Sequence, residues 1–166
     1  MPFRHAIEAG VAFIMTAHVL VPSFDEERPA TLSRRIVYDL LRDELGFGGV
    51  ILSDDLEMKA VAATWTVPDA AVQAIAAGCD GVLVCRALGT DRVRDIDAQV
   101  EVLEALVHAV EDGRIPYTRL DDALTRQRRA KERFLAAPVT AGPRAVRQVV
   151  GRDEHARIAE EMARYL

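Results

Sequence analysis

A pair of carboxylates follows a short apolar run in the segment Gly46–Leu56, which reads GFGGVILSDDL. The glycines indicate a helix end and a turn, and Val50–Leu52 is typical of a strand that stops near Asp54 and Asp55. In parallel α/β sheets and barrels, catalytic groups gather at the carboxyl ends of strands. One carboxylate is therefore a candidate nucleophile or metal ligand. On spacing alone, a Ser-Asp-Asp triplet beginning at Ser53 more often just caps the following helix.

A histidine follows a second apolar run, Val11–Met15, so His18 also stands at a predicted strand end. An imidazole there could transfer protons, contact substrate or be a satisfied buried group. Because the sequence gives it no partner, we favour a structural or substrate-contact role over a proton shuttle. The charged segment Pro22–Thr31 lies on the same rim and is expected to be a solvated loop.

One pattern that could position these residues occurs three times: a helical segment ends at a glycine, and a short apolar strand follows. The strands are apolar along their whole length, as expected for a parallel sheet covered on both faces. Their spacing of roughly thirty to forty residues is that of a βα unit. The pattern predicts three parallel βα units, with the pairs Gly10 and Val11–Met15, Gly46 and Val50–Leu52, and Gly78 and Val82–Cys85.

Capping residues and apolar stripes predict the helices, with Ser33 capping the first and Thr66 opening the second. They are expected over Arg34–Leu45, 67–77, Val93–Glu111, Thr118–Leu135 and Asp153–Leu166, with a break at Pro138–Pro143. We divide the chain into residues 1–137, which hold the βα units, and residues 138–166, a linker and final helix. A closed (β/α)8 barrel needs ~250 residues, so three units are either an open sandwich or part of something larger.

Composition excludes several classes of protein. The 166 residues include 21 Lys and Arg against 26 Asp and Glu, a net charge of −5, which argues against nucleic-acid binding. The basic run Arg126–Arg133 has no interleaved aromatics and is expected to be the solvated side of a helix. Cys79 and Cys85 form neither a zinc pattern nor a disulfide framework, so we predict no metal and a reducing compartment. No apolar run approaches the ~18 residues of a membrane helix.

An ordered series of short motifs gives a more specific indication. Each motif is ordinary alone, but their order and spacing together resemble the bacterial β-N-acetylhexosaminidases of glycoside hydrolase family 3, over about residues 1 to 135. The motifs lie in Phe3–Val11, Ile14–Val19, Pro29–Ser33, Leu41–Val50 and Ser53–Met58.

The resemblance implies an α/β fold that is the C-terminal part of a (β/α)8 TIM-type barrel, followed by a helical tail. It implies a retaining hydrolase whose nucleophile is the Asp directly after a Ser or Thr at the end of the penultimate strand, which is Asp54 here. An ionised carboxylate there can stabilise an oxocarbenium-like transition state and then bond to the sugar. We group Asp55, Met58 and His18 as residues that support the nucleophile or bind substrate.

The resemblance also implies groups that this sequence does not contain. In the family, a His paired with an Asp on a mobile loop protonates the leaving group, and Lys-His and Arg residues hold the sugar. These lie on earlier strands, and His18 does not match the catalytic His. Losing a general acid costs about 100- to 10,000-fold in rate, so we expect little or no activity from this chain alone.

The implied substrate is an N-acetylglucosamine-containing saccharide or muropeptide from cell-wall turnover, cleaved without cofactor, nucleic acid or membrane. We expect a cytoplasmic protein, with any targeting segment upstream of Met1. Two alternatives stay open. One is a β-glucosidase-like member of the family, although those usually have Ser-Asp-Trp at this point. The other is a non-catalytic α/β module that self-associates through its open sheet edges.

Overall fold

The computed structural model describes residues 2–85, 96–135 and 150–164. Contacts divide the chain into two compact units, Met1–Arg133 and Phe134–Leu166. The first holds the sheet and most helices, and the second holds helix α7 (Asp153–Ala163), which has no buried residue. The predicted break at Pro138–Pro143 lies outside the described residues, as do residues 93–95 and 165–166 of the predicted helices.

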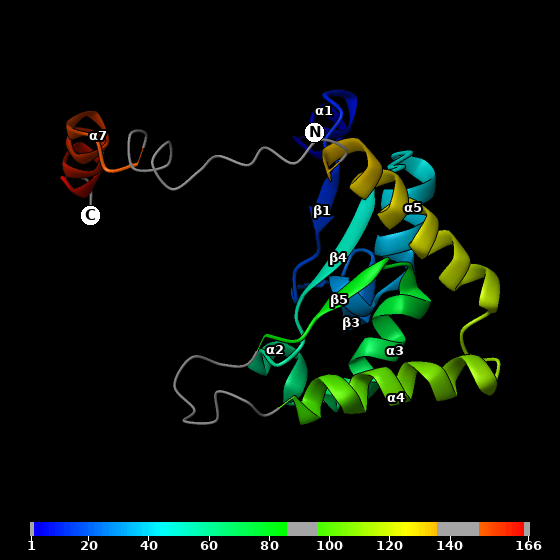
Figure 1. Ribbon diagram of the computed structural model, residues 1–166. Coiled ribbons are helices and arrows are strands. Elements are labelled where there is room, and N and C mark those ends of the chain that lie inside the picture. The colour runs from blue at the N-terminus through cyan, green and yellow to red at the C-terminus, as the bar shows by residue number, and fades with distance from the viewer. Residues whose placement is uncertain (1, 86–95, 136–149, 165–166) are drawn as a thin grey trace. The chain divides into compact units, whose positions relative to one another are not determined.

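Three short parallel strands form the sheet of the first unit (Figure 1). They are β1 (Phe13–Met15), β4 (Val50–Asp55) and β5 (Gly81–Leu83), in the order β1-β4-β5. Met15 lies opposite Leu52, whereas β4 slips by one residue against β5 between Leu52 and Asp55. The predicted parallel α/β arrangement is thus confirmed, and the middle strand extends to include both carboxylates.

Helices follow and precede these strands as the glycine pattern predicts. Thr66 caps α3 (Val67–Ala77) by accepting a hydrogen bond from the Asp69 amide at 3.2 Å, and Gly78 ends that helix with φ of +126°. The other α-helices of this unit are α1 (Pro2–Glu8), α2 (Lys59–Ala62), α4 (Asp97–Glu111) and α5 (Tyr117–Leu135).

The helix predicted over Arg34–Leu45 is wound differently from expectation. It is a π-type helix, η2 (Arg35–Glu44), in which the closing amide of Leu45 donates to the Leu40 carbonyl, five residues earlier. The predicted cap is wrong, because the buried Ser33 hydroxyl has no partner among the described residues. The Ser33 carbonyl instead accepts hydrogen bonds from the first turn of the helix.

The segment Pro22–Thr31, expected to be a solvated loop, contains regular structure. Strand β3 (Asp25–Pro29) pairs antiparallel with β2 (Leu20–Val21) and leads into the 3₁₀ turn η1 (Ala30–Leu32). Thr31 is fully buried. Four consecutive charged residues carry little strand propensity, so this hairpin depends on the buried residues that follow it rather than on its own sequence.

The core lies between the sheet and helices η2 and α3. Its fully buried side chains include Val37, Phe47, Ile51 and Leu56, which come from both layers. Gly49 allows the turn before β4 to pack closely, because a Cβ there would lie 2.5 Å from the Ala12 carbonyl oxygen. The glycine and apolar pattern therefore brings the end of β4 to a fixed place.

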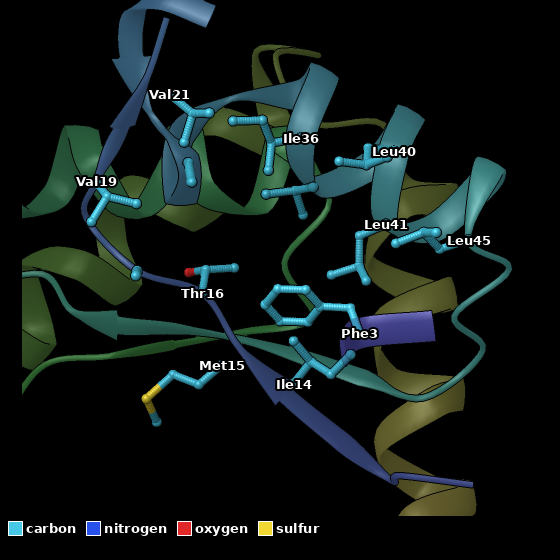
Figure 2. A pocket seen from close by; sticks show the side chains of 13 residues that line it. Phe3, Ile14, Met15, Thr16, Val19, Val21, Ile36, Leu40, Leu41 and Leu45 are labelled. Atoms are coloured by element: carbon cyan, nitrogen blue, oxygen red, sulfur yellow. The ribbon is translucent and has the colours of Figure 1, made fainter. Parts of the chain in front are cut away.

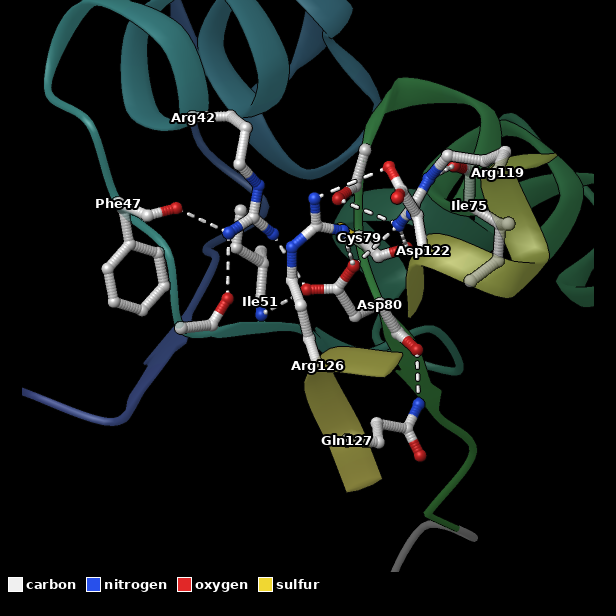
Figure 3. Close-up of polar contacts among 12 residues, drawn as sticks. Arg42, Phe47, Ile51, Ile75, Cys79, Asp80, Arg119, Asp122, Arg126 and Gln127 are labelled. Atoms are coloured by element: carbon white, nitrogen blue, oxygen red, sulfur yellow. Dashed lines mark hydrogen bonds and ion pairs between the residues drawn. The ribbon is translucent and has the colours of Figure 1, made fainter. Parts of the chain in front are cut away.

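A buried carboxylate just before β5 joins several elements (Figure 3). Asp80 accepts from the guanidinium groups of Arg42 and Arg119 at 2.7 Å and from that of Arg126 at 3.1 Å. It also accepts from the Ile51 amide at 3.0 Å. The expectation that the basic run is solvated is wrong for Arg126, which turns inward to this carboxylate. This cluster lies at the amino end of β5, away from the strand ends that carry the candidate site.

Candidate active site

The carboxyl ends of three strands meet at one edge of the sheet, because all three run in the same direction. Hydrogen bonds join the segments that leave these strands. The His18 ring, after β1, lies with Nε2 2.8 Å from the Asp55 carbonyl oxygen. The Cys85 amide, after β5, donates to Asp55 Oδ1 at 3.0 Å. Residues far apart in sequence are therefore held around the end of β4.

Asp54 is the penultimate residue of β4, at this edge of the sheet, where the sequence predicts it. Its Oδ1 accepts a hydrogen bond from the Asp55 amide at 2.8 Å, and its Oδ2 has no partner among the described residues. Ile51 and Ser53 on one face of β4 are fully buried, whereas Leu52 and Asp54 on the other are half-buried. The alternation along the strand thus puts the Asp54 side chain on the face opposite to the buried Ile51 and Ser53.

The residues on either side of Asp54 bind the backbone of β5 and of the residues after it. Ser53 Oγ accepts from the Leu83 amide at 2.9 Å, and Asp55 Oδ1 accepts from both the Glu57 amide at 3.1 Å and the Cys85 amide. These side-chain oxygens accept from backbone amides where the register of β4 and β5 shifts, in place of the backbone carbonyls of a regular ladder. Such a shift is a β-bulge, which is common beside active sites. The alternative that the triplet caps the next helix is wrong, because α2 starts after Met58 without a side-chain cap.

His18 contacts two groups through its two ring nitrogens. Nδ1 is 2.9 Å from the Thr31 hydroxyl, which in turn accepts from the Thr16 hydroxyl at 2.9 Å. Because the Asp55 carbonyl can only accept, Nε2 carries a proton. Neither threonine was identified from the sequence. Their signal was weak, since a threonine near a strand end is ordinary.

Met58 is only loosely connected to the site. Its amide donates to the Asp55 carbonyl at 3.1 Å, while its side chain is 44% exposed. The structure therefore brings His18, Asp54 and Asp55 together and leaves the Met58 side chain at the surface. The roles assigned to these four residues in substrate binding and catalysis stay predictions.

Two further acidic or ionisable groups belong to this edge. Cys85 is exposed, and the cost of desolvating its thiolate, together with the nearby Asp55 carboxylate, raises the pKa of its thiol. The buried Oε2 of Glu57 has no partner among the described residues. The sequence analysis considered Cys85 only as half of a zinc or disulfide pair, and nothing in the sequence distinguished Glu57 from a surface carboxylate.

Two kinds of site are absent from the part of the chain that is described. No group of three or more His, Cys, Asp or Glu side chains there could hold a metal ion. Likewise, none of the described helices combines the length and apolar character of a membrane span.

An apolar cavity of about 260 Å³ lies apart from these carboxylates, between β1 and η2. Figure 2 shows Phe3, Ile14 and Leu41 pointing into it from α1, β1 and η2. Thr16 supplies the one hydroxyl among its side chains, and no charged group lines it. A sugar needs polar partners, so this cavity is suited to packing against another apolar element rather than to binding saccharide.

Comparison with known proteins identifies the family. The profile of the "Glycosyl hydrolase family 3 N terminal domain" matches residues 1–130. A β-hexosaminidase from Nitrosomonas eutropha is 38% identical over 141 residues, covering 82% of this chain and 38% of that protein. Another β-hexosaminidase, from Chromobacterium violaceum, is 46% identical over 85 residues, covering 51% of this chain and 24% of that protein. The chain thus spans well under half the length of these relatives.

Solved structures show the same likeness in three dimensions. The family 3 β-N-acetylglucosaminidase from Paenibacillus sp. str. FPU-7 superposes with a TM-score of 0.80 at 39% identity, covering 96% of this chain and 29% of that one. The β-N-acetylhexosaminidase from Beutenbergia cavernae gives a TM-score of 0.66 at 35% identity, covering 78% and 36%. Both are substantially longer than this chain.

Proposed function

This chain belongs to glycoside hydrolase family 3, and from that membership we propose that it carries the nucleophile of a retaining β-N-acetylhexosaminidase. Asp54 is the proposed nucleophile. The observation that carries the proposal is an Asp54 carboxylate at the carboxyl end of the middle strand, with Oδ2 free of partners among the described residues. The names of the relatives support the reaction class, and the strand-end position supports the residue.

The proposed chemistry needs an ionised and fixed carboxylate. Asp54 Oδ2 attacks the anomeric carbon as the bond to the leaving oxygen breaks, giving a covalent glycosyl ester that water later hydrolyses. The Asp55 amide on Oδ1 fixes the direction of the carboxylate. Ser53 and Asp55 act as orienting groups by joining this strand end to the backbone of β5 and Cys85.

In this proposal, some of the catalytic and sugar-binding groups come from residues outside this chain. The general acid and the groups that hold the sugar belong to the preceding, longer part of the barrel. This chain is the C-terminal part of that barrel, with three βα units. We therefore propose that the chain alone has little or no hydrolase activity, because both proton transfer and substrate positioning contribute large factors to rate.

N-acetylglucosamine-containing saccharides are the proposed substrates, with muropeptides from cell-wall turnover as the specific class. The relatives named β-hexosaminidase and β-N-acetylglucosaminidase support the sugar. Two free cysteines, Cys79 and Cys85, support a reducing compartment such as the cytoplasm. No metal or organic cofactor takes part in this mechanism.

A chimera tests the proposal. Residues 1–135 of this chain replace the matching segment of the Nitrosomonas eutropha β-hexosaminidase, and release of 4-nitrophenol from its N-acetyl-β-glucosaminide is measured. We expect the chimera to be active and the isolated chain to be inactive. Asp54→Asn should lower kcat of the chimera by more than about 1,000-fold, the scale seen when a nucleophile is removed.

The matched control is Asp43→Asn, which removes an exposed carboxylate from η2. It should leave kcat unchanged. Robust release of 4-nitrophenol by the isolated chain would contradict the proposal that residues outside this chain are needed for activity. A folded chimera that keeps its activity with Asp54→Asn would show that Asp54 is not the nucleophile.

A further inference from the structure

The end of β1 and the end of β4 are joined by a side chain rather than by the sheet ladder. The last backbone bond between them among the described residues runs from the Thr16 amide to the Leu52 carbonyl at 2.9 Å. Beyond it the chain leaves β4 toward β2. Three residues after the Met15–Leu52 pair, His18 Nε2 donates to the carbonyl of Asp55, also three residues further on. The imidazole therefore extends the connection to the residue that follows Asp54.

The ring is held by a chain of hydroxyl groups. The Thr16 hydroxyl donates to the Thr31 hydroxyl, which lies 2.9 Å from His18 Nδ1. With Nε2 protonated, Nδ1 of a neutral ring accepts, so the Thr31 proton points to it. Every donor in the series Thr16, Thr31, His18 then points the same way and ends at the Asp55 carbonyl. Such a directional series is stronger than its separate bonds, and it selects one tautomer.

The Asp55 carbonyl that accepts from His18 belongs to a residue with several other hydrogen bonds. Asp55 also accepts from the Met58 amide through the same carbonyl, and from the Cys85 and Glu57 amides through its carboxylate. Its own amide holds Asp54 Oδ1 at 2.8 Å. The carbonyl lies in the 55–56 peptide group and the amide in the 54–55 group. Both groups meet at the Asp55 Cα, so a displacement of the Asp55 backbone would change the direction of the Asp54 carboxylate.

The geometry points to His18 as a positioning residue: its Nε2–H tautomer, held by Thr16 and Thr31, fixes the Asp55 backbone and so aims Asp54. This inference rests on the proposed function of Asp54 as nucleophile. It assigns the ring no proton transfer to the sugar and no contact with it. The fully buried Thr31 hydroxyl supplies the second contact that a merely exposed histidine would lack.

Two substitutions separate the contacts of the ring. His18→Gln keeps an amide donor at about the position of Nε2, whereas His18→Asn reaches only the Nδ1 side and loses the bond to Asp55. In the same chimera, we expect His18→Asn to lower kcat about 10- to 100-fold, the cost of a small misplacement of a reacting group. KM should change little, because the bound sugar is not touched. His18→Gln should retain most of the kcat.

The matched control is His108→Asn, which changes an exposed ring on α4 paired with Glu111. It should leave kcat and KM unchanged. Equal losses for His18→Asn and His18→Gln, or a change in KM alone, would overturn the positioning role. If the chimera is active and sensitive to Asp54→Asn but insensitive to His18→Asn, the inference fails and the proposed function stands.

A second measurement uses the full 166-residue chain and needs no activity. Nitrogen-15 NMR of the imidazole at pH 8 should give a protonated Nε2 and an unprotonated Nδ1. Thr31→Val should weaken that preference without reversing it, because the Asp55 carbonyl still accepts from Nε2. The Asp54 and Asp55 amide resonances should shift more in His18→Asn than in His18→Gln. A ring protonated at Nδ1, or one that averages both tautomers, overturns the inference even if the chimera proves inactive and the proposed function is lost.

Discussion

A single buried carboxylate connects several elements of the first unit. Asp80 is fully enclosed and binds guanidinium groups from η2 and from α5, together with the Ile51 amide of β4. Burial lowers the pKa of Arg42, and the Asp80 charge opposes that change. Among the described residues, Arg42 and Arg119 pair with no other carboxylate, so nothing replaces Asp80 for these two groups.

Replacing that carboxylate should destabilise the fold. We expect Asp80→Asn to lower the free energy of unfolding by about 3 to 5 kcal/mol, because it leaves partly buried guanidinium groups without their counterion. Urea denaturation followed by circular dichroism measures this. The control is Asp122→Asn, whose carboxylate is exposed and contacts the same Arg126 at 3.4 Å. That change should cost less than about 1 kcal/mol, and equal losses would contradict a special role for Asp80.

The two cysteines should differ sharply in reactivity. Burial, followed by the adjacent Asp80 carboxylate, raises the pKa of the Cys79 thiol from 9.0 to about 12. Cys85 is exposed, and its pKa is raised by desolvation and by Asp55. We expect iodoacetamide at pH 8 to label the native chain at Cys85 alone, and both thiols in urea. Cys85→Ser should abolish native labelling, and rapid labelling of Cys79 would contradict its burial.

The same pKa difference gives a pH dependence of stability. The unfolded Cys79 thiol ionises near its ordinary pKa of 9.0, whereas the folded one stays protonated until about 12. The folded state therefore binds the proton more tightly, and stability falls as pH rises between these two values. Denaturation midpoints at pH 8 and pH 10 should differ less in Cys79→Ala than in the original chain, once its lower overall stability is subtracted.

Among the elements, α3 gives the most direct test of local capping. The Thr66 hydroxyl accepts from the Asp69 amide and donates to the Asp69 carboxylate at 2.7 Å, closing the first turn. Thr66→Ala should lower the free energy of unfolding by about 0.5 to 2 kcal/mol. Thr64→Ala, an exposed neighbour outside the helix, is the control and should cost almost nothing. Denaturant midpoints that fall equally for both would rule out the capping effect.

Elements whose sequence carries its own signal were predictable. The cap at Thr66, the glycine at Gly78 and the apolar run into Asp54 were sufficient to place α3 and β4. The hairpin after Val19 and the π winding of η2 were not predictable, because both depend on what packs around them rather than on local propensity. Sequence patterns report what a segment prefers, and tertiary contacts decided these two cases.

The candidate site was predictable to a different degree. The strand end brought Asp54, Asp55 and His18 to attention, since strand ends are where chemistry gathers. The partners that orient them were missed, because Thr16 and Thr31 are ordinary in sequence and are brought together only by the folded chain. A role that depends on a hydrogen bond between residues so distant in sequence leaves no local pattern to find.

At the scale of the whole molecule, the described sheet leaves apolar surface uncovered. Strand β1 is an edge strand, and Met15 on it is 54% exposed. The cavity between β1 and η2 continues this surface, and Leu103 on α4 is also exposed beyond β5. In a closed barrel, further strands and helices would cover both edges. Without them, these edges are available to a second copy of the chain.

We therefore expect the isolated chain to self-associate through the edge formed by β1. Light scattering over a concentration series should give a rising apparent mass, because edge pairing and burial of Met15 both favour association. Met15→Lys adds a charge to that edge and should lower the apparent mass toward that of the monomer. Met162→Lys changes a comparably exposed methionine on α7 and is the control. A constant monomer mass, or equal effects of both variants, would show that β1 is not the associating edge.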